Sequence, residues 1–288
     1  MRSKKEGFMR FGRMMTIWVL AALFFLLAGC GGVDSPFGSQ TKTSLRSHNQ
    51  KTIRTLVAQG TGKTGLIRIG LLADSHQNYK GLEEAIEHLN RLPLDFVIHL
   101  GDFTNIGLNV EFDAFLRTVS KLRHPYVALI GNHDAIGAGI PMYEQIFGDF
   151  NPSFSYAGRR ILLYNSNSLE FENHEGYDPG WAARELADAT EPTYLFQHVN
   201  YDNKTHFTDD EIASFEAMMR SAPDLRFALN GHLHVGTHGG LGSIRLATIP
   251  RSEGGQYAIL ELDPAKDSLS FCEGSQCQEV AVGPGSGI

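Results

Sequence analysis

The sequence has no long run of lysine or arginine, and its charge balance is acidic. Of its 288 residues, 25 are Lys or Arg and 32 are Asp or Glu, which gives a formal net charge of −7. Five of the basic residues lie in residues 1–29, where Glu6 is the one acidic residue, so the remainder is more acidic still. Because non-specific nucleic-acid binding depends on neutralising phosphates, this composition argues against a nucleic-acid-binding protein. It does not exclude small phosphorylated substrates.

The apolar run near the start of the chain is too short to span a membrane. It covers residues 14–28, about fifteen residues against the roughly 20 that a transmembrane helix needs. A basic stretch precedes it and Leu27-Ala28-Gly29-Cys30 ends it, the layout of a secretion signal. These four residues match the lipobox, so the segment resembles a bacterial lipoprotein signal. The alternative is an uncleaved signal anchor in which Cys30 is incidental.

The lipoprotein resemblance implies that residues 1–29 are removed and that Cys30 carries acyl chains, more than one of which would anchor it stably. We therefore expect an exported, membrane-anchored protein on the periplasmic or outer face. Residues 30–65, rich in Gly, Ser, Thr, Gln and Lys, are predicted to be the lipidated cysteine and a flexible tether. One folded domain is predicted over residues 66–272, with a tail over residues 273–288.

Cysteine is scarce, and two of the three cysteines, Cys272 and Cys277, lie close together near the end of the chain. They lack further Cys or His partners at the spacing of a structural metal site. Disulfides form and persist in exported proteins. We expect the two thiols to pair as a local staple.

From residue 66 onward, short apolar stretches alternate with amphipathic ones, which is typical of an α/β fold. The predicted strands are residues 66–73, 95–100, 126–130, 161–164, 193–197 and 226–229. Residues 80–92 and 111–122 carry apolar stripes at helical spacing, and two more helices are predicted to begin at Asp178-Pro179 and at the capping box 208–211. No internal repeat is evident, so the sequence predicts a single domain.

Polar residues directly follow five of these strands. They are Asp74, Asp102, Asn132, His198 and His232. Because ligand sites in open α/β sheets form at the carboxyl ends of strands, these side chains are expected to converge. Carboxylate, amide and imidazole groups suit divalent or trivalent transition metals such as Mn, Fe, Zn or Ni. With His76 and His234 there are seven candidate ligands, more than one ion can hold, so two ions with a shared carboxylate are predicted.

The polar residues belong to five short blocks that occur in a fixed order over residues 74–234. The blocks are Asp74-Ser75-His76, Gly101-Asp102, Gly131-Asn132-His133-Asp134, His198 and Gly231-His232-Leu233-His234. This set resembles the signature blocks of calcineurin-like metallophosphoesterases. The resemblance implies a β-sandwich of two mixed sheets flanked by helices.

The same resemblance implies a role for each site residue. One ion would be held by Asp74, His76, Asp102 and His234, and the other by Asp102, Asn132, His198 and His232. His133 would face the scissile phosphate, where it stabilises the transition state or protonates the leaving oxygen, and Asp134 would orient it.

Such a site needs no side-chain nucleophile, because a water bridging two cations is acidified enough to act as hydroxide near neutral pH. We expect hydrolysis of small phosphoesters, with diesters slightly ahead of monoesters, because no insertion between the blocks is long enough for a cap domain. Loops around residues 165–177 and 201–207 would set specificity. Asn105, Asn200 and Tyr201 are further candidates for substrate contacts.

Two other interpretations remain open. The chain could be a noncatalytic metal-binding scaffold on the same fold, although His133 and all seven candidate ligands are present. Membrane anchoring also suits a hydrolase of a lipid or cell-wall phosphoester, although no single residue in the sequence indicates one.

Overall fold

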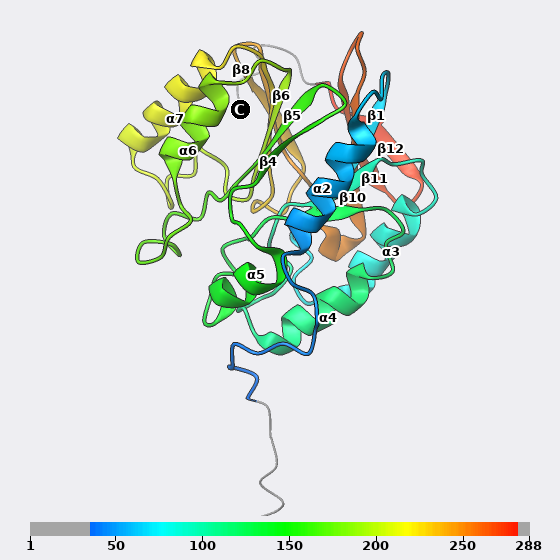
Figure 1. Ribbon diagram of the computed structural model, residues 1–288, viewed down its shortest axis with the longest axis vertical. Helices are drawn as coiled ribbons and strands as arrows, with labels where there is room; N and C mark the ends of the chain where they lie inside the picture. The colour runs from blue at the N-terminus through cyan, green and yellow to red at the C-terminus, as the bar shows by residue number, and fades with distance from the viewer. Residues whose placement is uncertain (1–34, 282–288) are drawn as a thin grey trace, which may run out of the picture. The chain divides into compact units, whose positions relative to one another are not determined.

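The computed structural model describes residues 35–281 of the chain (Figure 1). The predicted signal peptide and Cys30 lie outside these residues. A compact unit begins at Phe37. Among the helices of residues 35–281, none combines the length and apolar character that crossing a bilayer requires.

Two six-stranded mixed sheets form the centre of the fold. The first sheet contains β1 (Ile67–Leu72), β2 (Phe96–His99), β3 (Tyr126–Ala128), β10 (Gln256–Leu262), β11 (Ser268–Glu273) and β12 (Gln276–Glu279). Its order is β12-β11-β10-β1-β2-β3, in which β1, β2 and β3 run parallel and the others pair antiparallel.

The second sheet has the order β4-β5-β6-β7-β9-β8. Its strands are β4 (Ser153–Tyr156), β5 (Arg159–Tyr164), β6 (Thr193–Gln197), β7 (Leu225–Asn230), β8 (Thr237–Leu241) and β9 (Ile244–Thr248). The inner faces of both sheets meet in one apolar core, to which Ile69, Phe96, Leu163 and Phe227 contribute. The parallel strands are buried on both faces, which explains their nearly continuous apolar sequences.

Helices cover the two outer faces, so the domain has four layers, as Figure 1 shows. The first sheet packs against α3 (Tyr79–Leu89), α4 (Asn109–Val119) and α5 (Gly139–Phe147), and the second against α6 (Pro179–Ala187) and α7 (Asp209–Ser221). The predicted caps are present, since the side chains of Asp178 and Thr208 each accept a backbone N–H bond. The predicted α/β fold of two mixed sheets flanked by helices is therefore confirmed.

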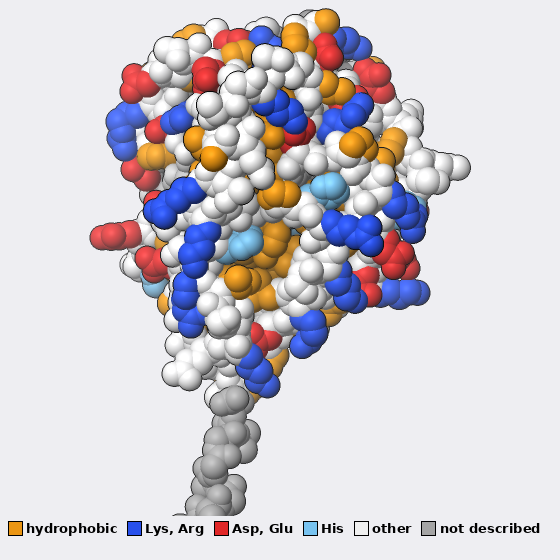
Figure 2. All heavy atoms as spheres, turned by 45° about the vertical axis from the view of Figure 1, so that its right-hand side comes forward, with side chains coloured by type: hydrophobic (Ala, Val, Ile, Leu, Met, Phe, Trp, Pro, Cys, Tyr) orange, Lys and Arg blue, Asp and Glu red, His pale blue; other side chains and the backbone are white. Residues whose placement is uncertain are grey.

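The surface has mixed charge on the face drawn in Figure 2. Lys and Arg side chains are interspersed there with Asp and Glu, and hydrophobic side chains appear in small groups between them.

The prediction of a flexible tether through residue 65 is wrong for the helix α2 (His48–Gly60). Leu56 of this helix is fully buried, and the side-chain amide of Asn49 pairs with the backbone of Ala128 in β3, donating at 2.8 Å and accepting at 3.0 Å. These contacts join residues far apart in the sequence, and they include polar bonds as well as the packing of Leu56. A pattern of apolar residues at helical spacing indicates a helix only when the helix buries a continuous apolar face, so it does not reveal contacts of this kind.

The predicted C-terminal tail also begins too early, because residue 273 lies inside the β11–β12 hairpin. Cys272 and Cys277 lie opposite each other in this hairpin and are joined by a disulfide. Regular structure continues to Glu279, so the folded domain extends into the segment predicted to be a tail.

Candidate metal centre

The loops that leave β1, β2, β3, β6 and β7 bring the candidate ligands together. In one group, Asp74, His76, Asp102 and His234 each present a ligand atom within 4.8 Å of the others. A second group of the same compactness contains Asp102, His198 and His232. Asp102 belongs to both groups, which is the arrangement that a shared carboxylate between two ions requires.

Asn132 joins the second group through its side-chain oxygen. Its Oδ1 lies 3.0 Å from His198 Nε2 and 3.0 Å from His232 Nδ1. The structure thus places all seven candidate ligands at one end of the two sheets, as the strand-end argument predicts.

The ligand loops hold an unusual backbone conformation. Five non-glycine residues of the site have positive φ angles: Asp74 at 49°, His76 at 42°, Asp102 at 57°, His232 at 71° and His234 at 62°. Among the other described residues, Ser47 and Ala157 are the non-glycine residues that share this feature. Such conformations cost free energy and persist where the surrounding structure enforces them, often at functional sites.

Gly131 is required by close packing beneath Asp102. A Cβ atom at this position would lie 2.1 Å from Asp102 Oδ1 and 2.2 Å from the backbone nitrogen of Asp102. No flexible neighbour can relieve that contact, since one of the atoms is backbone. Glycine therefore allows the shared carboxylate to lie against the β3 loop.

The proton positions of the second group favour a cation. His198 Nδ1 donates to the carbonyl of Leu100 at 2.7 Å, so in the neutral imidazole Nε2 carries a lone pair. That nitrogen lies 3.2 Å from Asp102 Oδ2 and 3.0 Å from Asn132 Oδ1, and Asp102 Oδ2 is buried without a hydrogen-bond donor. Acceptors that face one another in a buried site need a cation between them, and this donor set suits a transition metal.

The first group shows the same arrangement. His76 Nδ1 donates to the carbonyl of Thr104 at 3.2 Å, which leaves its Nε2 as an acceptor 3.1 Å from Nε2 of His234. A carbonyl that fixes the outer nitrogen of a ligand imidazole is the usual support of a metal-binding histidine. Both groups therefore fit metal ions.

Without a cation, the site holds protons instead. Burial raises the pKa of Asp74 to about 7, assisted by Asp102 and opposed by His198. Burial lowers the pKa of His198, but the carboxylates of Asp102 and Asp74 outweigh it and raise that pKa to about 9. Burial also raises the pKa of Asp102, but His198, His133 and His76 together lower it, so the net shift is downward. A metal ion must displace protons to bind.

Metal removal is therefore expected to destabilise the protein more at pH 8.5 than at pH 6. The folded pKa values of Asp74 and His198 lie above their unfolded values, so the metal-free folded state binds extra protons and loses stability as pH rises through this window. Metal binding strengthens over the same window, because fewer protons compete. Thermal unfolding with Mn²⁺ or EDTA at several pH values measures the difference in Tm, and a difference that shrinks with rising pH would contradict this proton competition.

His133 lies beside the ligands without belonging to either group. Its ring centroid is 5.0 Å from that of His76, and its backbone nitrogen donates to Asp102 Oδ1 at 3.0 Å. Its Nδ1 donates to the carbonyl of Asn105 at 2.7 Å. The ring is thus fixed through one nitrogen, which leaves Nε2 for the transfer of a proton.

The expectation that Asp134 orients His133 is wrong. Asp134 is fully buried, and its carboxylate accepts bonds from the backbone nitrogens of Asp102, Thr104 and Gly131 at 2.8–2.9 Å and from the Thr104 hydroxyl at 2.8 Å. Burial, with the charge of Asp102, raises its pKa to about 8, against four donors that favour the ionised form. The carboxylate joins the β2 and β3 loops, and the Asn105 carbonyl takes the orienting role.

Replacing Asp134 with alanine is expected to destabilise the folded protein by at least about 3 kcal/mol, because four buried donors would lose their acceptor. Asp134→Asn, which keeps one acceptor oxygen, is expected to lose less. Urea unfolding of the metal-free proteins measures both effects. Normal stability combined with a lower kcat and an altered pH profile would instead restore a direct role beside His133.

Glu111 is a site residue that the sequence did not reveal as one. It is 3% exposed, and it accepts bonds from the backbone nitrogens of Asn105, Ile106 and Leu108 at 2.9–3.3 Å. These bonds fix the loop whose Asn105 carbonyl holds His133. Glu111 lies three residues after Leu108, the spacing of a capping box, but Leu108 has no hydroxyl to complete the Ser/Thr-x-x-Glu pattern, so the sequence offers no signal for this role.

His206 is the second addition to the site. Its ring centroid is 5.1 Å from that of His232, and its carbonyl accepts a bond from the Ser168 hydroxyl at 2.8 Å. Burial lowers its pKa, which favours a neutral imidazole beside the second ligand group. It lies in the loop 201–207 that is predicted to set specificity, but no sequence pattern singles it out within that loop.

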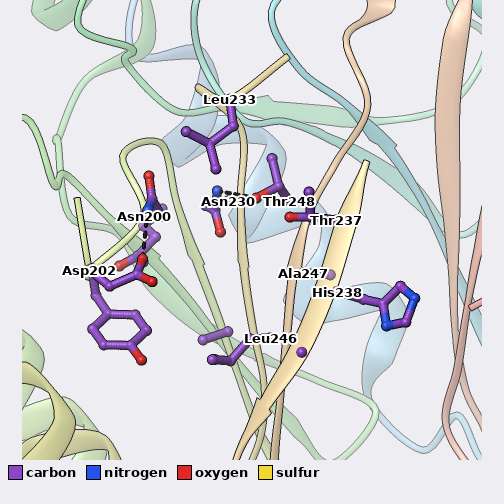
Figure 3. Close-up of a pocket in the computed structure, with 13 residues that line it drawn as sticks. Asn200, Asp202, Asn230, Leu233, Thr237, His238, Leu246, Ala247 and Thr248 are labelled. Atoms are coloured by element: carbon purple, nitrogen blue, oxygen red, sulfur yellow. Dashed lines mark hydrogen bonds between the residues drawn. The ribbon is translucent and has the colours of Figure 1, made fainter. Parts of the chain in front are cut away.

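Asn200 and Tyr201 do not join the ligand groups. They line a neighbouring cavity of about 150 Å³, shown in Figure 3, between the loop after β6 and the strands β7, β8 and β9. Asn200 Nδ2 donates to Asp202 Oδ1 at 2.6 Å, and the Tyr201 hydroxyl donates to Glu216 at 3.4 Å. Substrate contact by either residue stays a prediction, as it does for Asn105, whose backbone holds His133.

A larger groove of about 750 Å³ begins at the first ligand group. It is lined by His234, Val235, Gly236, Pro250, Arg251, Gln256, Phe271, Cys272, Glu273, Gln276, Cys277 and Gln278. Arg251 is paired with Glu253 at 3.4 Å. The groove thus connects the metal centre with the disulfide-linked hairpin.

The chain is similar to known proteins in sequence and in fold. A probable glycerophosphodiester phosphodiesterase GpdQ of Arcobacter nitrofigilis is 41% identical over 58 residues, which are 19% of this chain and 21% of that relative. The similar segment therefore spans about a fifth of the relative's length.

Solved structures share the fold at low sequence identity. A dimetal phosphatase of Danio rerio superposes with a TM-score of 0.60 at 13% identity, over 76% of this chain and all of that one. A purple acid phosphatase of yellow lupin gives 0.57 at 14% identity, over 75% and 53% of the two chains. The profile of the calcineurin-like phosphoesterase family matches residues 67–236, which contain every candidate ligand. The chain belongs to the calcineurin-like phosphoesterase family.

Proposed function

We propose that this hydrolase of phosphoester bonds acts on phosphodiesters in preference to monoesters, with two transition-metal ions held by the two ligand groups. The preference for diesters rests on one observation, the groove that starts at His234. A phosphodiester has a substituent on each side of phosphorus, so it can fill the metal centre and the groove together. A monoester has no second substituent to use this space.

Charge supports the same choice. A monoester is a dianion near neutral pH, and its second charge needs an additional cation. Arg251, the arginine of the groove, is already paired with Glu253. The relative from Arcobacter nitrofigilis is described as a probable phosphodiesterase, which also favours diesters for this chain.

The residues of the site have different roles in the reaction. When bound, two such ions activate water and offset charge on the phosphoryl oxygens. The Asn105 carbonyl accepts the Nδ1–H bond of His133, so Nε2 can give a proton to the leaving oxygen when the ring is the doubly protonated imidazolium. Asp134 and Gly131 hold the loops of Asp102 and His133 in register.

The test is a comparison of two chromogenic substrates. Protein stripped of metal and reloaded with Mn²⁺ is expected to hydrolyse bis-p-nitrophenyl phosphate with a higher kcat/KM than p-nitrophenyl phosphate. Faster hydrolysis of the monoester would overturn the preference. Inactivity on both substrates with Mn, Fe, Zn and Ni would contradict the proposal as a whole.

We also propose that the protein is exported and anchored through a lipidated Cys30. The support is the sequence Leu27-Ala28-Gly29-Cys30 after an apolar run of about fifteen residues. Palmitate labelling of the wild type, absent from Cys30→Ser, is the expected result. Equal labelling of the two proteins would contradict it.

A further inference from the structure

One side of the groove is formed by residues paired across β10, β11 and β12, and we call this side the wall. In the first sheet, Gln256 of β10 lies opposite Glu273 of β11, which lies opposite Gln276 of β12. In the next row, Phe271 lies opposite Gln278. Side chains alternate between the faces of a strand, so these five residues share the inner face of the sheet.

This wall is the part of the inner face that the second sheet leaves uncovered. Phe271 still packs against the core between the sheets, whereas Glu273, Gln276 and Gln278 are exposed. The loop after His234 closes the other side, because a Cβ at Gly236 would lie 2.9 Å from the Phe271 ring. The disulfide between Cys272 and Cys277 ties β11 to β12 between the two rows.

The glutamines of the wall have free hydrogen-bonding capacity. Within residues 35–281, no side-chain hydrogen bond engages Gln256, Gln276 or Gln278. Each primary amide offers two donors and one acceptor oxygen, a combination that matches hydroxyl groups, which also donate and accept. Neighbouring side chains across strands are about 5 Å apart, which is comparable to the width of a sugar ring.

The charges of the groove argue for an uncharged occupant. Arg251 is paired with Glu253 at 3.4 Å, and Glu273 contributes a negative charge in the same row as two glutamines. An anionic substituent would meet Glu273 without a free arginine to offset it. Phe271 and Val235 add apolar surface, against which the C–H faces of a sugar can pack.

We propose that this groove binds a neutral polyhydroxylated substituent, a sugar or polyol, of the phosphodiester. The inference rests on the proposed phosphodiesterase function and names the class of substrate. The wall of amides, in register across β10, β11 and β12, recognises the hydroxyl groups, and the metal centre at His234 receives the phosphate.

The experiment compares two diesters that differ in the substituent meant for the groove. The Mn²⁺-loaded protein is assayed on the p-nitrophenyl diester of glucose 6-phosphate and on ethyl p-nitrophenyl phosphate. The wild type is expected to show the lower KM for the glucosyl diester. The double variant Gln276→Ala/Gln278→Ala is expected to raise that KM roughly tenfold, the effect of losing two hydrogen bonds, with little change in kcat or in either constant for the ethyl diester.

Gln145→Ala, at an exposed position on α5, is the matched control, and its constants are expected to equal those of the wild type. An unchanged KM for the glucosyl diester in the double variant, or an equal rise for both diesters, would overturn the inference. If the wild type cleaves the ethyl diester and not the glucosyl one, the inference fails and the phosphodiesterase function stands. Cleavage of neither diester, with p-nitrophenyl phosphate hydrolysed, overturns both.

Discussion

Replacing His133 with alanine is expected to lower kcat for bis-p-nitrophenyl phosphate by about 10²–10⁴-fold, the usual contribution of a general acid, while metal content stays at the wild-type level. His133 lies beside the ligands but outside both groups, so its loss removes a proton donor and no metal ligand. Turnover and metal content, measured on the same preparation, separate these effects.

A second substrate tests what His133 supplies. The p-nitrophenolate ion leaves without protonation more readily than phenolate, so a general acid matters more for the phenyl ester. We expect a larger loss of kcat for bis-phenyl phosphate than for bis-p-nitrophenyl phosphate. Equal losses would assign His133 to charge stabilisation instead. His124→Ala is the control, since that histidine precedes β3, at the opposite end of the strand from the site, where its ring bonds the Leu89 carbonyl.

Asp102→Asn is expected to weaken Mn²⁺ binding by more than about a hundredfold. Substitution of residues that only hold the ligands in place already weakens metal binding by about 10–100-fold. Asp102 is the one residue shared by both ligand groups, so the substitution affects both ions. Asparagine keeps the size of the side chain and tolerates the left-handed backbone at this position. Metal content after dialysis and the rise in Tm on adding Mn²⁺ are the measurements.

The metal-free Asp102→Asn protein is expected to remain folded, because the substitution removes the repulsion between Asp102 and Asp74 that adds to the effect of burial on the pKa of Asp74. A Tm close to that of the metal-free wild type would show that lost activity reflects lost metal. Asp188→Asn, at an exposed position after α6, is the matched control. Full activity and two bound ions in Asp102→Asn would exclude a shared carboxylate.

The elements that carry the site were predictable because their signal is local. Each of β1, β2, β3, β6 and β7 is a short apolar run that stops at a polar residue, and chain order then places those residues at one end of the sheets. The ligand positions follow from this pattern. The positive φ angles at five of the ligands do not follow from this pattern. The surrounding loops impose these angles on residue types that rarely adopt them.

The residues that the sequence did not place depend on contacts between distant segments. Asp134 stands next to His133 in the chain, yet its carboxylate turns to the backbone of the β2 loop, about thirty residues earlier. His206 reaches His232 through a loop whose path no periodicity describes. Asn49 is polar and lies in a segment of tether-like composition, although it is fully buried against β3.

The pairing between Asn49 and Ala128 has a consequence for where the folded domain can be cut. β3 is an edge strand of the first sheet, and α2 occupies the backbone groups of Ala128 that would otherwise be open to another strand. An uncovered sheet edge is a template for pairing with other chains. Proteolysis between α2 and β1, or a recombinant fragment that begins there, would free this edge beside the loop of Asn132 and His133 and favour aggregation. A soluble fragment has to begin before His48.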